Sequence, residues 1–104
     1  MKNSQIAEFF VLRDLEKNQK LEGSHFFIDG NTIYSYGYHF PIAVKLKDGF
    51  LFNSCGYSMT TAKHKGYVKR AIGNNFIIEL STEKLKNCIN DDIKSIKEVI
   101  IEKL

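Results

Sequence analysis

The apolar and polar positions of the first half of the chain follow a helical period and then a strand period. Apolar residues near the 3.6-residue period predict an N-terminal helix over residues 4–19, capped by Ser4. Short β-type runs then follow, separated by turns, and Asp-Gly in a turn between two such runs is a β-hairpin signal. The expected strands are 25–28 and 32–36, joined by the turn 29–31, and 42–46 and 50–53, joined by the turn 47–49.

The second half of the chain alternates between helical segments and one apolar run of strand length. A helix is expected from Thr60 or Thr61 to about residue 72, where Gly73 stops it. Residues 76–80 suit a strand, and 81–90 suit another helix. The segment 93–104 is rich in β-branched residues and fits a strand or a helix, and we expect a helix.

Together these elements predict an α+β fold with one small domain over residues 1–104. About three to five antiparallel strands are expected, packed against the N-terminal helix. A central helix at about 61–72 and one or two C-terminal helices complete the prediction.

Composition narrows the class of protein without naming an activity. The chain has 104 residues, of which 43% are hydrophobic and one is proline, which excludes a disordered chain. No apolar run approaches the ~18 residues that cross a bilayer, and the N-terminus lacks a signal-peptide core. We therefore expect a cytoplasmic protein without a membrane partner. Cys55 and Cys88 are expected as reduced thiols, with no metal site and no cofactor.

The net charge of +3 is unevenly distributed along the chain. The flanking segments 1–38 and 76–104 each contain one more acidic than basic residue, so the positive excess lies in 39–75. A local positive field of this kind attracts polyanions or acidic proteins, although lysines on a solvated face also serve solubility alone. The charged residues of this segment are Lys45, Lys47, Lys63, Lys65, Lys69 and Arg70, against Asp48.

A run of aromatic residues lies in the same central segment. Alternate side chains of an extended strand point to the same face, so Tyr34, Tyr36 and Tyr38 are expected to share one face. Three tyrosines on one face form a stacking platform for bases or an aromatic patch for a protein partner. The same pattern also fits the core-facing side of a sheet.

His64 lies on the apolar stripe of the central helix, at helical spacing from Val68 and Ile72. It is therefore expected to face the sheet and to need a hydrogen-bond partner. One interpretation is a neutral histidine that locks the helix onto the strands. The other is a polar cluster at the mouth of a pocket, formed by His39, Asn53, Thr60, Thr61 and His64.

The order of these residues resembles an uncharacterised family of small proteins from bacteriophages and other mobile elements. The resemblance covers about residues 33–72 and has three parts. They are Tyr-Ser-Tyr-x-x-His-Phe-Pro-Ile-Ala from Tyr34, Phe52-Asn53, and Tyr-Ser-x-Thr-Thr-x-x-His from Tyr57. The resemblance implies a mobile-element origin, location in the host cytoplasm, and a role as a regulator or an inhibitor of host defence.

The expected function is a small non-enzymatic binding protein of this phage or mobile-element type. It would act on a host protein or on a nucleic-acid-handling complex. One alternative is direct nucleic-acid binding by the basic helix 61–72, and another is a small hydrolase or nuclease using His39 and His64. A homodimer is compatible with each. The candidate binding residues are Tyr34, Tyr36, Tyr38, His39, Asn53, Thr60, Thr61, Lys63, His64, Lys65, Lys69 and Arg70.

Overall fold

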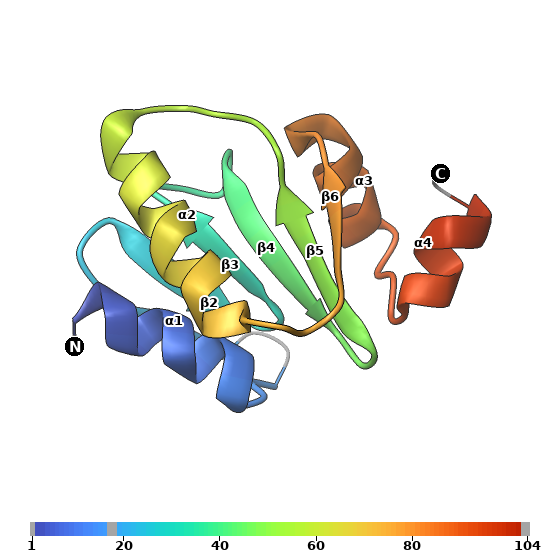
Figure 1. The fold of residues 1–104 in the computed structure, drawn as a ribbon, viewed down its shortest axis with the longest axis horizontal. Coiled ribbons are helices and arrows are strands. Elements are labelled where there is room, and N and C mark those ends of the chain that lie inside the picture. The colour runs from blue at the N-terminus through green and yellow to red at the C-terminus, as the bar shows by residue number, and fades with distance from the viewer. Residues whose placement is uncertain (1, 17–18, 103–104) are drawn as a thin grey trace.

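A six-stranded sheet with helices on both faces forms the centre of the computed structural model, which describes residues 2–16 and 19–102 (Figure 1). The α+β class expected from the hydrophobic pattern is confirmed. In chain order the elements are α1 (Asn3–Leu12), β1 (Lys20–Glu22), β2 (Phe26–Asp29), β3 (Thr32–Ser35), β4 (Pro41–Leu46), β5 (Gly49–Asn53), α2 (Met59–Ile72), β6 (Ile77–Leu80), α3 (Thr82–Asn90) and α4 (Ile96–Glu102).

The strands lie in the sheet in their sequence order, from β1 at one edge to β6 at the other. The first five form an antiparallel meander, whereas β6 runs parallel to β5. The predicted antiparallel sheet is thus confirmed for the first five strands, but the sheet has six strands instead of three to five, and the sixth is parallel. The expected strands omit β1 because Lys20-Leu21-Glu22 is too short and charged to give a strand signal. β6 is parallel because α2 carries the chain back along the sheet before the strand begins.

Each face of the sheet has its own apolar core and its own pair of helices. Figure 1 shows α1 and α2 together on one side of the sheet and α3 and α4 on the other. The first core joins Phe10 of α1 and Val68 of α2 to strand residues such as Phe26. The second core joins Leu85 of α3 and Val99 of α4 to Leu51 and other residues of β4–β6.

The end of α1 and the start of α2 differ from the predicted boundaries. α1 ends at Leu12 and not near residue 19, because Arg13 has an extended backbone with φ −124° and ψ 150°. Residues 17 and 18 of the predicted helix lie outside the described residues. α2 begins at Met59, and its cap is Ser58 instead of Thr60 or Thr61. The Ser58 hydroxyl accepts a hydrogen bond from the backbone N–H of Thr61 at 3.1 Å.

The predicted end of α2 holds, since Gly73 terminates the helix with φ 60° and ψ −125°. β4 begins at Pro41, one residue before the predicted strand 42–46, because the missing N–H of proline is tolerated at the first residue of a strand. The C-terminal segment forms a helix over 96–102, and residues 103 and 104 lie outside the described residues. No helix among the described residues is long and apolar enough to cross a membrane.

One end of the sheet collects the connections that precede β2, join β3 to β4, and follow β5. We call it the aromatic end and define it by His25, Tyr36, Tyr38, His39 and Tyr57. α2 and α3 both begin at this end, because each follows the carboxyl end of β5 or β6 (Figure 1). The first turn of α1 lies there too, since the Asn3 Oδ1 atom accepts a hydrogen bond from the backbone N–H of Ser24 at 3.3 Å.

Candidate binding site at the aromatic end of the sheet

Three half-exposed tyrosines lie at the aromatic end. The exposed fractions are 43% for Tyr36, 52% for Tyr38 and 59% for Tyr57. Tyr36 stacks on His25 with 5.0 Å between ring centroids. The hydroxyl of Tyr57 lies 3.2 Å from Nε2 of His39. These side chains are held by ring and hydrogen-bond contacts while much of each tyrosine remains open to solvent.

Tyr34, Tyr36 and Tyr38 do not share one face, so that prediction is wrong. β3 ends at Ser35, and Tyr36 has a positive φ of 67°, which turns the chain away from the strand direction. Tyr36 therefore lies beside His25, with its ring centroid 6.2 Å from that of His64.

Tyr34 and Tyr38 instead form an aromatic cluster with Phe27. Tyr34 stacks on Phe27 with 5.0 Å between centroids, and Tyr38 packs edge-on against Tyr34 at 4.9 Å. The Tyr38 hydroxyl donates to Oδ2 of Asp29 at 2.7 Å. Tyr34 itself is buried, which raises the pKa of its phenol, and only Tyr38 of this cluster offers a large accessible ring.

His64 is buried beneath this end and belongs to a continuous chain of hydrogen bonds. Its Nδ1 atom lies 2.7 Å from the Ser35 hydroxyl, which in turn lies 2.9 Å from the Thr61 hydroxyl. The Thr61 hydroxyl accepts from the hydroxyl of Ser58 at 3.1 Å. The chain of contacts thus ties the first two turns of α2 to the end of β3. The interpretation of His64 as a lock between helix and sheet agrees with these contacts.

The surroundings of His64 determine its tautomer and its charge. Because Asn3 Oδ1 accepts from Ser24 N–H, Asn3 Nδ2 donates to His64 Nε2, at 3.4 Å. Nδ1 therefore holds the proton and donates to Ser35. Burial, together with the nearby His25, lowers the pKa of His64 and favours the neutral ring. Its ring also stacks on Phe26, with 4.7 Å between centroids.

The predicted polar cluster of five residues does not form as one group. His64 bonds to Ser35 and Asn3, and not to Thr60, Asn53 or His39 of the predicted cluster. Thr60 is exposed, and His39 pairs with Tyr57. Sequence spacing could not reveal these partners, because Ser35 and Asn3 approach α2 from distant parts of the chain.

Asn53 belongs to a second network, at the end of β5. Its Nδ2 atom donates to the Pro41 carbonyl at 2.8 Å and to the Thr82 hydroxyl at 2.9 Å. Its Oδ1 atom accepts from the backbone N–H of Cys55 at 2.8 Å. Asn53 is fully buried and thus joins β4, β5 and the start of α3. These contacts use its amide for structure.

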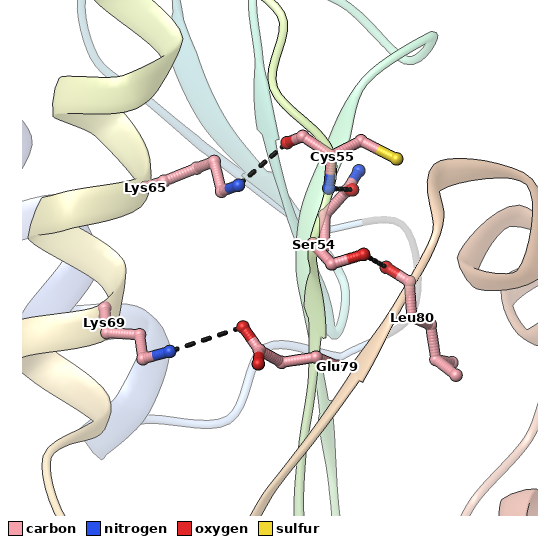
Figure 2. Close-up of polar contacts among 7 residues, drawn as sticks. Ser54, Cys55, Lys65, Lys69, Glu79 and Leu80 are labelled. Atoms are coloured by element: carbon pink, nitrogen blue, oxygen red, sulfur yellow. Dashed lines mark hydrogen bonds and ion pairs between the residues drawn. The ribbon is translucent and has the colours of Figure 1, made fainter.

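The basic side chains of α2 divide into two pairs. Lys65 is half-buried, which lowers the pKa of its ammonium, and it donates to the Cys55 carbonyl at 2.8 Å (Figure 2). Lys69 forms an ion pair with Glu79 at 3.4 Å (Figure 2). Lys63 and Arg70 are exposed on the outer side of the helix, and the Arg70 guanidinium lies 5.7 Å from the Tyr67 ring centroid. The basic helix therefore presents fewer uncommitted cations than its sequence suggests.

Cys55 lies just after the end of β5, close to the start of α3. Hydrogen bonds from the backbone and hydroxyl of Thr82, at the start of α3, lower the pKa of the Cys55 thiol, and Lys65 acts in the same direction. No sequence signal links Cys55 to Thr82, since they meet only when β6 lies beside β5. Among the described residues, no group of three or more His, Cys, Asp or Glu is arranged to hold a metal ion.

The fold and this end of the sheet define a small α+β protein with helices on both faces of a mixed sheet and an exposed aromatic surface at one end. The chain belongs to a family of unknown function, DUF8033, whose family model matches residues 10–86. The expectation of an uncharacterised family is thereby confirmed. No curated protein and no solved structure shows significant similarity to the chain.

Proposed function

We propose that the protein is a small non-enzymatic binding protein that engages a protein partner through the aromatic end. The observation that carries this proposal is the gathering of Tyr36, Tyr38 and Tyr57 at one end of the sheet, each about half exposed. Tyrosine is enriched at the energetic centres of protein interfaces, because its ring supplies a large contact area with few rotatable bonds. The hydrogen-bonded residues beneath these rings give the surface a rigid base.

The state of the histidines favours binding over hydrolysis. General acid–base catalysis needs a group that reaches the substrate and can exchange a proton. His64 is only 3% exposed, and both of its ring nitrogens already have protein partners. His39 is accessible, but its nearest polar contact is the Tyr57 hydroxyl. The arrangement therefore supports a structural role for His64.

The electrostatics of the aromatic end favour an acidic partner. The first turns of α1, α2 and α3 meet there, and the N-terminus of a helix carries a partial positive charge. Lys63, exposed in the second turn of α2, adds a full charge. In keeping with the phage or mobile-element type, the partner would be a host protein or a component of a nucleic-acid-handling complex. Binding would then inhibit or regulate that partner.

The experiment compares capture of a partner in the host cell by the wild-type chain and by matched variants. Tyr57→Ala and Tyr38→Ala remove exposed rings from the aromatic end. Phe76→Ala removes a ring that is 56% exposed at the opposite end, before β6, and serves as the control. With the purified partner, the Kd is expected to rise at least about tenfold for the tyrosine variants. Phe76→Ala is expected to leave it unchanged.

A second set of titrations tests the alternative, which is direct nucleic-acid binding by α2. Random single- and double-stranded DNA and RNA are titrated at low and high salt. Nucleic-acid binding that weakens with salt, and that Lys63→Gln weakens while Tyr57→Ala does not, would replace the protein partner with direct binding by α2. Equal loss of partner capture in Tyr57→Ala and Phe76→Ala would also contradict the proposal.

A further inference from the structure

A cavity of about 350 Å³ lies at the end of the sheet opposite the aromatic end. The turns after β2 and β4 and the residues that follow α1 surround it. Its apolar wall has the almost fully buried Phe10, Ile28 and Leu46 at its base and the half-buried Leu15 at its surface. The volume lies within the range of roughly 300–1,000 Å³ that is typical of small-molecule sites.

Four cationic side chains line this cavity, against a single acidic one. Lys45 and Lys47 come from the basic central segment, and Arg13 and Lys94 come from the flanking segments. The acidic residue is Asp14. The fold therefore concentrates positive charge beside an apolar wall, which the charge distribution along the sequence does not show.

Lys45 is the most informative of these cations. Its side chain is 21% exposed, and its ammonium lies 2.9 Å from Oδ1 of Asp14, whose side chain is 91% exposed. The ammonium also donates to the Arg13 carbonyl at 3.2 Å. An exposed carboxylate contributes little to an ion pair, whereas a half-buried ammonium retains a strong requirement for an anion. A stronger anion can therefore take the place of Asp14 without disturbing the core.

The neighbouring cations are suited to a shared anion. Lys47 is exposed at the turn between β4 and β5, and its backbone N–H donates to the Lys94 carbonyl at 3.3 Å, which holds these two residues together. The Lys94 ammonium pairs with Asp92 at 2.9 Å, in an exposed contact. Arg13 and Lys47 can thus bind the same anion as Lys45. Guanidinium and ammonium groups are the usual protein ligands of phosphate.

We propose that this cavity binds a small phosphate-bearing ligand with an aromatic body, of the size of a nucleoside monophosphate. Lys45, with Arg13 and Lys47, holds the phosphate. The flat body of the ligand lies against the half-buried Leu15 and the aliphatic stems of the lysines. This site lies at the other end of the sheet from the aromatic end, so it stands independently of the proposed partner.

The test is a titration of the full chain, followed by amide chemical shifts and by calorimetry. AMP and UMP are the probes, with adenosine and inorganic phosphate as half-ligands. The nucleotides are expected to shift the amides of residues 13–15, 30–31 and 45–47, with a Kd of about 1 mM or lower, and to bind at least about tenfold more tightly than either half-ligand. Equal binding of phosphate and nucleotide, or shifts confined to other residues, would overturn the proposal.

Variants distinguish a specific binding site from nonspecific electrostatic attraction. Lys45→Gln is expected to weaken nucleotide binding at least about tenfold, and the exposed Lys47→Gln about threefold. Lys63→Gln removes the same charge from α2 and is the matched control, expected to leave the affinity unchanged. If Lys63→Gln weakens binding as much as Lys47→Gln, the attraction is nonspecific and the proposal fails. Denaturation of each variant confirms that it is folded.

Discussion

Ser35 Oγ lies 2.7 Å from His64 Nδ1, so the last residue of β3 holds the buried histidine of α2. Both residues are almost completely buried, and the hydrogen bond joins positions that are distant in the sequence. Directly after Ser35 the chain turns through Tyr36 into the aromatic end. The contact therefore fixes where the exposed tyrosines stand relative to α2.

Thr60 and Thr61 offer a matched pair for testing this network. Thr61 is buried and its hydroxyl contacts those of Ser35 and Ser58, whereas Thr60 is exposed. Thr61→Ala leaves buried hydroxyls without a partner and is expected to lower the free energy of unfolding by about 1–3 kcal/mol. Thr60→Ala is expected to change it by less than about 0.5 kcal/mol. Urea denaturation measures both, and equal losses would contradict the network.

The lowered pKa of His64 predicts that stability depends on pH. The unfolded chain binds a proton near pH 6.5, about the ordinary value for histidine, but the folded chain resists that proton. The contribution of His64 is thus complete above about pH 6.5 and declines as the pH falls through the lowered pKa.

Urea denaturation at pH 7.5 and pH 5.5, both chosen above the main carboxylate range (about pH 4), tests this dependence. The wild type is expected to be less stable at the lower pH, and His64→Gln is expected to reduce the difference. His39→Gln removes an exposed imidazole and is expected to retain the full difference in stability between the two pH values. A wild type that is equally stable at both values would refute the expectation.

Asn53 is expected to tolerate no charge. In Asn53→Asp a carboxylate oxygen replaces the amide nitrogen that donates to the Pro41 carbonyl at 2.8 Å, so two oxygens would face each other in the core. We expect a loss of at least about 2 kcal/mol at pH 7. Asn87→Asp makes the same change at an exposed position of α3 and should cost less than about 0.5 kcal/mol. Similar melting temperatures for the two variants would count against this role of Asn53.

Gly73 and Gly56 differ in backbone conformation, which predicts opposite responses to alanine. Gly73 has φ 60° and ψ −125°, a combination that is almost confined to glycine, so Gly73→Ala is expected to cost about 1–3 kcal/mol. Gly56 has no positive φ, and a Cβ there meets no atom within 4 Å. Gly56→Ala should be neutral or stabilising by up to about 1 kcal/mol. Thermal denaturation ranks the two, and the reverse order would disprove the assignment.

Most of the fold could be predicted from turn and cap chemistry. The Asp-Gly turns located the hairpins of β2–β3 and β4–β5, and Gly73 located the end of α2, because these signals act over a few neighbouring residues. β1 escaped prediction because its pairing with β2, not its own composition, makes it a strand. The direction of β6 depends on the path of α2 over the sheet, which no local pattern reveals.

The candidate site could be predicted only in part. The helical period correctly predicted that His64 is buried against the sheet. Its hydrogen-bond partners Ser35 and Asn3 could not be predicted, because tertiary packing determines them. The rule of alternate faces failed for the tyrosines because the positive φ of Tyr36 ends the strand there. His25 and Tyr57 carried no signal as site residues, since their ring contacts join separate loops.

The parallel pairing of β6 with β5 has a consequence for the time course of folding. The five-stranded meander is built from neighbouring strands, so its contacts can form early. β6 is separated from β5 by the whole of α2, so it can pair only when this long connection closes. Closing the connection costs conformational entropy before the contacts between β5 and β6 can form. The bond between Asn53 and Thr82 must wait for that step. We therefore expect the start of α3 to reach its final position late, after the strands beside it have already assembled.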